Sequence, residues 1–79
     1  MMVAYKKKYL KHFGFGEQDF VPSEVSGLPA HDIHHVLFKS HGGTDDIENL
    51  IALTRDEHER AHSDSEFNDT LKQLIKKRS

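Results

Sequence analysis

Residues 32–62 read DIHHVLFKSHGGTDDIENLIALTRDEHERAH, and this stretch decides the fold. Residues 31–37 carry branched and aromatic side chains that favour a buried β-strand. The polar, glycine-containing residues 39–49 predict a loop, and the apolar residues 50–53 predict a second strand. Thr54 and Glu57 then have the spacing of a capping box, which predicts a helix that runs to about His62. The expected order is strand, loop, strand, helix.

Two further helices are expected on either side of this stretch. Residues 2–12 have apolar side chains at helical spacing, and Gly14 and Gly16 stop the pattern. Ser63 and Glu66 offer a second capping box for a terminal amphipathic helix. The segment between the first helix and residue 31 holds both prolines and is expected to be irregular. Five aromatic residues are expected to pack in the core: Tyr5, Tyr9, Phe13, Phe15 and Phe20.

The bulk composition limits the class of protein. Seventy-nine residues suffice for one small domain with a marginal core, which is often stabilised by a disulfide, a metal or a partner chain. The chain has no cysteine, so a disulfide is excluded. No run of 18 apolar residues is present, and lysines interrupt the start of the chain, so we expect a soluble, cytoplasmic protein without a membrane segment.

Charge is distributed unevenly along the chain. Lysine and arginine without acid occupy both ends, and all 13 acidic residues lie between them. Basic ends around an acidic, histidine-rich middle suit a polyanion that is gripped at its flanks. Two solvated helix faces explain the same pattern equally well.

Histidine is concentrated in the central stretch, because six of the seven lie between residues 31 and 62. His58 and His62 are four apart on the predicted helix, so their imidazoles share one face and can bind one transition-metal ion. A third ligand is expected from His34 or His35 on the neighbouring strand. Three histidines with an open coordination position are typical of a catalytic metal rather than a closed structural one.

Taken together, the stretch resembles the HNH endonuclease family, in particular its colicin-like and phage members. The resemblance runs through His35, the Gly-Gly-x-Asp loop, Asn49-Leu50, His58 and His62, and covers about 32 of the 79 residues. It implies an α+β fold with a small ββα-metal core, the His-Me finger, at residues 31–62. An N-terminal and a C-terminal helix would complete a single HNH nuclease domain over residues 1–79.

The resemblance also implies roles for individual residues. His34, His58 and His62 fill metal-ligand positions, and His35 fills the position of the general base. Asn49 fills the family's N position in the catalytic site, where it braces the loop and orients the base. Asp32 could orient one of the ligands. The cofactor would be one divalent metal ion, Zn, Ni, Mn or Mg, and three imidazoles favour the softer ions over Mg.

The implied function is a metal-dependent endonuclease that hydrolyses DNA phosphodiester bonds. The alternatives are a metal-stabilised nucleic-acid-binding module without cleavage activity, and a chain that binds zinc only in order to fold. The expected partner is DNA. One active site cuts one strand at a time, so cutting both strands would need a homodimer or two sequential nicks, and a protein partner could deliver the enzyme.

The sequence departs from the family pattern at the CxxC pairs that bind a structural zinc in many members. Ser23 and Ser26 stand at the first pair, and Thr54 and Glu57 at the second, so we predict no structural zinc.

A geometric requirement also follows from the adjacent histidines. Neighbouring residues of a regular strand point to opposite faces. The strand must therefore end or distort at His34 and His35 if both are to serve one cleft.

Overall fold

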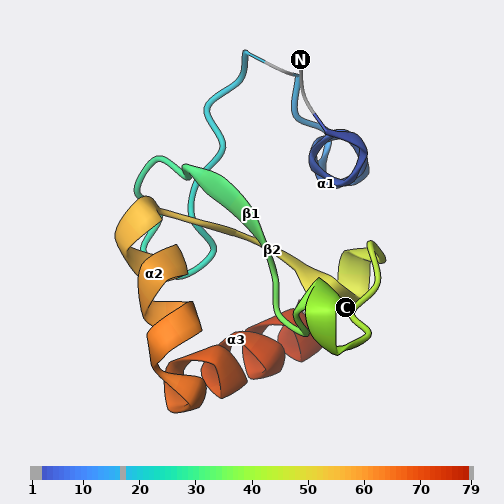
Figure 1. The fold of residues 1–79 in the computed structure, drawn as a ribbon. Helices are drawn as coiled ribbons and strands as arrows, with labels where there is room; N and C mark the ends of the chain where they lie inside the picture. Colours follow the sequence, from blue (N-terminus) through green and yellow to red (C-terminus); the bar gives the residue numbers. More distant parts are fainter. Residues whose placement is uncertain (1–2, 17, 79) are drawn as a thin grey trace.

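The computed structural model describes residues 3–16 and 18–78. In chain order it contains helix α1 (Ala4–Phe13), strand β1 (Asp32–His35), strand β2 (Leu50–Leu53), helix α2 (Arg55–Ser63) and helix α3 (Ser65–Lys77) (Figure 1). Two short 3-10 turns, η1 (Lys39–His41) and η2 (Ile47–Asn49), lie between the strands. The predicted α+β class, a ββα core with an N-terminal and a C-terminal helix, is confirmed.

The two strands pair antiparallel, with His34 opposite Ile51 and His35 opposite Leu50. β1 covers Asp32–His35 and is shorter than the predicted residues 31–37. After one more backbone bond, from the Val36 N–H to the Asn49 carbonyl (3.0 Å), side chains take the hydrogen bonds that would continue the strand. The Leu37 backbone N–H donates to the Asn49 side chain (2.7 Å), and the Val36 carbonyl accepts from Asn68 (2.8 Å). The strand therefore ends at the histidine pair, as a shared cleft requires.

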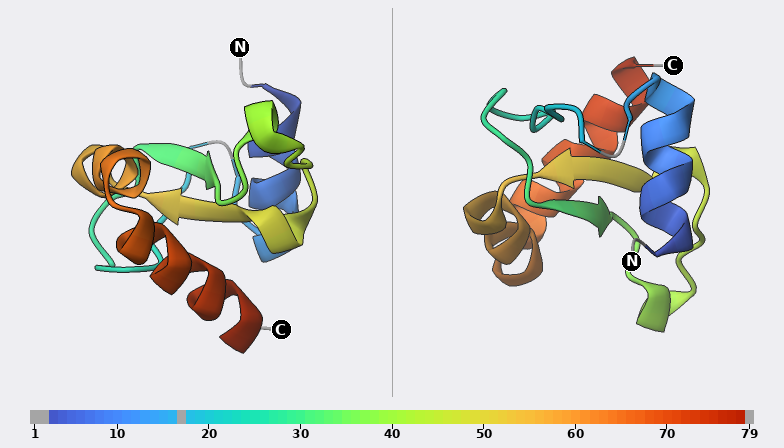
Figure 2. Two further views of the ribbon diagram at one scale, coloured as in Figure 1. Left: turned by 60° about the horizontal axis from the view of Figure 1, so that its bottom comes forward. Right: turned by 90° about the horizontal axis from the view of Figure 1, so that it is seen from above.

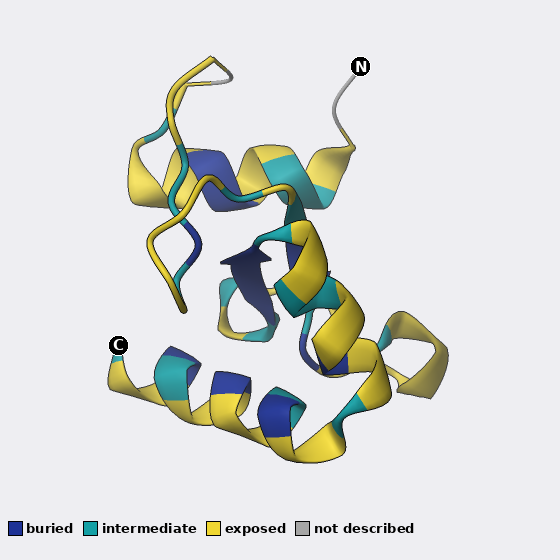
Figure 3. Ribbon diagram, turned by 90° about the vertical axis from the view of Figure 1, so that its left-hand side faces the viewer, coloured by how far each residue is buried: buried dark blue, intermediate teal, exposed yellow. Residues whose placement is uncertain are grey.

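β2 is the centre of the fold, and all four of its residues are fully buried. Ile51 and Leu53 pack against α2 and α3, whereas Leu50 and Ala52 pack against α1. The sheet thus lies between α1 on one face and the two C-terminal helices on the other (Figures 1 and 2). Figure 3 shows that α1 and α3 turn buried residues inward and exposed residues to solvent, which is the pattern of an amphipathic helix, whereas in α2 only Ala61 is buried.

The helix ends follow local capping chemistry. Gly14, at φ 78°, ends α1 in the left-handed conformation that favours glycine, whereas the predicted start at residue 2 lies outside the described residues. The capping box of Thr54 and Glu57 is present at α2. The predicted cap of α3 was wrong by one residue. Asp64 caps this helix by accepting from two backbone N–H groups, while Ser63 remains the last residue of α2.

The aromatic residues were only partly predicted. Tyr9 is 2% exposed, as expected of a core residue. Phe13 and Phe20 are 37% and 60% exposed, so assigning them to the core was wrong. Tyr5 and Phe15 are partly buried and pack against the core cluster that contains Tyr9.

A polar cluster occupies the positions where the family resemblance places the two CxxC pairs. The Ser23 hydroxyl donates to the Glu57 carboxylate (2.5 Å), which also accepts from the backbone N–H of Thr54 (2.8 Å). Burial raises the pKa of Glu57, but the hydrogen bonds from Ser23, Thr54 and Ser26 outweigh it and hold the pKa below its ordinary value. Hydrogen bonds thus join the two chain segments that cysteines and zinc join in many members of the family that the sequence resembles.

Replacing Ser23 by alanine is expected to lower the free energy of unfolding by about 1–3 kcal/mol, because it removes a donor from a part-buried carboxylate. Ser23 itself is 3% exposed, so water cannot readily take its place. Urea unfolding measures the change, with the exposed Ser65→Ala as the matched control. Equal stability of the two variants would show that the cluster contributes nothing.

The end of α3 is tied to the rest of the chain by Arg78. Its guanidinium donates to the backbone carbonyls of Ile47 (2.6 Å) and Leu50 (2.7 Å), at the start of β2. It also pairs with Glu24, which accepts from the buried Tyr9 hydroxyl. One side chain therefore connects α3, α1 and the loop that precedes β2.

Candidate metal centre

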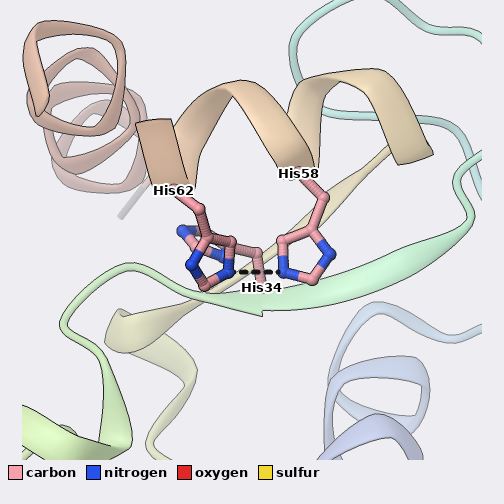
Figure 4. A group of neighbouring side chains, drawn as sticks. All are labelled: His34, His58 and His62. Carbon is pink, nitrogen blue, oxygen red and sulfur yellow. Dashed lines mark hydrogen bonds between the residues drawn. The ribbon is translucent and has the colours of Figure 1, made fainter. Parts of the chain in front are cut away.

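Three histidines converge from two elements. His34 lies on β1, and His58 and His62 lie one turn apart on α2, so that one ring nitrogen of each is within 4.8 Å of the others (Figure 4). Burial falls from His34, which is 1% exposed, through half-buried His58 to exposed His62. The site is therefore anchored in the protein interior and open to solvent at His62. Of the two residues expected as a third ligand, it is His34, and not His35, whose ring nitrogen lies close to those of His58 and His62.

The hydrogen bonds of His58 direct one of its ring nitrogens to Asp32 and the other to His62. His58 donates through Nδ1 to the Asp32 carboxylate (3.1 Å), as a metal-binding histidine usually does with its second nitrogen. Its Nε2 faces Nε2 of His62 at 3.2 Å. Two nitrogens bound tetrahedrally to one zinc ion, at ~2.0–2.1 Å each, lie ~3.3 Å apart. The spacing of these two atoms therefore fits a shared ion.

His34 is held in its neutral form. Burial lowers its pKa to about 4, and the neighbouring His58 and His62 act in the same direction, against a hydrogen bond with Asn68 that raises it. Its Nε2 lies 2.9 Å from the Asn68 side-chain oxygen. A neutral imidazole is the form that binds metal. His34 is thus in the form that could bind a metal ion at neutral pH.

This pKa shift predicts that the metal-free protein loses stability in mild acid. Below pH 6.5 the unfolded chain protonates His34, whereas the folded chain does so only near pH 4. The contribution of His34 is complete above about pH 6.5 and is lost as the pH falls towards 4, by roughly 3 kcal/mol. Urea unfolding with a chelator present, at several pH values, measures this slope. His34→Gln should flatten it, and an equally steep slope in that variant would assign it to other groups.

His35 borders the same cleft but has different partners. Its Nε2 lies 2.7 Å from the carboxylate of Asp45, and the ring of Tyr5 contacts it edge-on with centroids 4.5 Å apart. The hydrogen bond with His35 and that with Lys39 hold the pKa of Asp45 below its ordinary value. Because a carboxylate only accepts, Nε2 of His35 carries the proton and Nδ1 is left to accept one.

A cleft of about 280 Å³ brings the two adjacent histidines together. His34 faces α2 and His35 faces α1, yet both reach the cleft because β1 ends beside it. Its lining residues are Tyr5, Ile33, His34, His35, Phe38, Lys39, Ser40, His58 and His62. The adjacent histidines His34 and His35 thus reach one cleft, as they can only where the strand ends.

Asn49 closes the loop between the strands. Its side chain donates to the carbonyls of Leu37 (3.0 Å) and Thr44 (2.8 Å) and accepts from the Leu37 N–H (2.7 Å). Gly43 packs so closely on this turn that a Cβ atom would lie 1.8 Å from the Leu37 oxygen. The loop is therefore fixed at both ends, and it carries Asp45 to His35.

Four residues at the site were not predicted to act there. Tyr5 and Lys6 come from α1, and Lys6 lies 3.5 Å from Asp32, behind His58. Asp45 belongs to the loop and Asn68 to α3. Only Asp45 left a signal in the sequence, as the acid of the Gly-Gly-x-Asp loop. The other contacts depend on how the flanking helices pack, which spacing along the chain does not reveal.

This fold and site define a class of protein: a ββα core in which a strand and a helix bring together histidines that could hold one metal ion. Comparison with known families agrees, because the model of the HNH endonuclease family matches residues 18–64, which is 47 of the 79 residues. The chain belongs to the HNH endonuclease family. Members of this family generally use a divalent metal, and the three histidines could bind one.

Neither the curated proteins nor the solved structures gave a match. The family match leaves α1 and all of α3 outside it. Among residues 3–16 and 18–78, no helix is long and apolar enough to cross a membrane.

Proposed function

We propose that residues 1–79 form a single HNH nuclease domain that hydrolyses DNA phosphodiester bonds with one divalent metal ion. The observation that carries the proposal is the shared cleft, in which His35 lies beside the metal-binding group of His34, His58 and His62. A base and a cation on one small cleft are what hydrolysis of an anionic ester needs.

His35 would act as the general base. Its Nδ1 accepts the proton of a water whose oxygen attacks phosphorus, while the bond from phosphorus to the 3′ oxygen breaks. Asp45 stabilises the resulting imidazolium through the hydrogen bond at Nε2. The departing 3′ oxygen takes a proton from solvent water, so the products carry a 5′-phosphate and a 3′-hydroxyl. Asn49 acts at a distance, because it fixes the loop that carries Asp45.

The metal ligands would be His34, His58 and His62, with Asp32 orienting His58. When bound, a divalent cation supplies Lewis-acid stabilisation of the charge that develops on the phosphate and on the departing oxygen. Lys39, which is exposed at the rim of the cleft, offers a positive charge to the DNA backbone. Three imidazoles support Zn, Ni or Mn over Mg as the ion.

A nicking assay on supercoiled plasmid tests the proposal. The protein is supplied in turn with Mg²⁺, Mn²⁺, Ni²⁺ and Zn²⁺, and with a chelator as control. Conversion to open circles with at least one ion, and none with the chelator, is expected. A domain with one active site should nick before it linearises, and linear product formed directly would indicate a homodimer. Retention of the plasmid in a gel shift, without cleavage at any ion, would favour the nucleic-acid-binding module instead.

A further inference from the structure

We propose that Asn68 on α3 is a positioning residue for the metal centre, which holds His34 as the tautomer with its proton on Nε2 and its lone pair on Nδ1. The inference rests on the proposed metal site and adds a residue beyond it. Asn68 lies outside residues 18–64, the part of the chain that the family model matches. It therefore belongs to what this chain adds to the family's core.

The hydrogen bonds of Asn68 set the direction of its amide. Its nitrogen donates to the carbonyl of Val36 (2.8 Å), where β1 has just ended. Its oxygen is then the atom that faces Nε2 of His34, at 2.9 Å. An amide oxygen accepts and cannot donate, so the proton of a neutral His34 must be on Nε2.

This tautomer leaves one nitrogen of His34 with a lone pair for a shared ion. With Nε2 engaged by Asn68, Nδ1 is the only nitrogen of His34 that can bind a metal. Figure 4 shows the His34 ring lying against those of His58 and His62, and the ring centroids are 5.0 and 5.4 Å apart. Because His34 is 1% exposed, bulk water cannot substitute for the missing acceptor if Asn68 is removed.

The packing of α3 does not by itself need Asn68. Phe67, Leu71 and Ile75 bury the apolar face of the helix against β2 and α2, and Asp64 caps its start. The amide could still serve only as a link between α3 and the Val36 carbonyl. The experiment must therefore separate the acceptor that faces His34 from the donor that faces Val36.

Two substitutions make this separation. Asn68→Leu removes both the donor and the acceptor and keeps the branching at Cγ, whereas Asn68→Asp removes the donor to Val36 and keeps an oxygen towards His34. Zn²⁺ affinity is measured by calorimetry on the full chain at pH 7.5, and folding is checked by circular dichroism. Asn68→Leu should bind Zn²⁺ about 10- to 100-fold more weakly than the wild type, as expected when the hydrogen-bond partner of a ligand is lost. Asn68→Asp should stay within about threefold of the wild type.

The outcomes separate this inference from the proposed metal site. Failure of the wild type to bind Zn²⁺ would overturn the metal site and this inference with it. Binding by the wild type with equal affinities in all three proteins would overturn the role of Asn68 alone, as would equal losses in the two variants. The ¹⁵N spectrum of the His34 ring in the metal-free wild type needs no variant. It should show the proton on Nε2, and a proton on Nδ1 would overturn the inference.

Discussion

Replacement of His35 by alanine is expected to slow plasmid nicking by about 100- to 10,000-fold, the usual contribution of a general base. Nδ1 of His35 is the ring nitrogen left to take a proton from water, because Nε2 is engaged by Asp45. The candidate ligands His34 and His58 do not depend on His35, since their hydrogen bonds run to Asn68 and Asp32. Zn²⁺ affinity should therefore stay within a few fold of the wild type.

Two further observations make the His35 experiment decisive. His12, near the end of α1, does not line the cleft. The control variant His12→Ala should therefore nick at the wild-type rate. Nicking by His35→Ala at a rate close to that of the wild type would exclude His35 as the base. If His35→Ala lost both cleavage and Zn²⁺ binding, His35 would instead be assigned to the metal site.

Replacement of His58 by alanine is expected to have the largest effect on metal binding. The His58 ring contacts the rings of both His34 and His62 and is itself held by Asp32, so its loss leaves one buried and one exposed histidine without the ring that both contact. Zn²⁺ affinity should fall by more than about 100-fold, because even the loss of a ligand's hydrogen-bond partner costs 10- to 100-fold. Nicking should fall with it at micromolar metal. Calorimetry and the plasmid assay measure the two effects on the same samples.

The control for His58 is the neighbouring Glu59→Ala, an exposed change on the same helix. It should bind Zn²⁺ as the wild type does. Metal-dependent nicking by His58→Ala at low metal concentration would show that the ion is held elsewhere. An unfolded His58→Ala protein in the absence of metal would point to the third alternative, in which the ion serves only to fold the chain.

The ββα core could be predicted because its signals are local. The capping box of Thr54 and Glu57 fixes the start of α2, and the spacing of His58 and His62 then fixes their common face. The end of β1 was harder to predict, because it depends on Asn49 and Asn68, which take hydrogen bonds that would continue the strand. Asn49 was recognised from the family pattern alone, without a view of its contacts.

The contacts from the flanking helices could not be predicted from the sequence. Tyr5 reaches His35 and Asn68 reaches His34 only because α1 and α3 pack on opposite faces of the same short sheet. Neither residue has a spacing that indicates a site, and Tyr5 was expected only to pack in the core. The cap of α3 at Asp64 was missed for a related reason, since Ser63 has the right chemistry one residue too early.

The two ends of α3 have a joint consequence. Near its start Asn68 holds a histidine of the candidate metal site, and just beyond its end Arg78 holds the carbonyls of Ile47 and Leu50, next to Asn49. α3 thus connects His34, at the candidate metal site, with the residues on either side of Asn49, at the end of the loop between the strands. A shortened domain that ended at residue 64 would keep every candidate ligand and the candidate general base. It would lose the contacts of Asn68 and Arg78, which hold the two sides of the cleft in place.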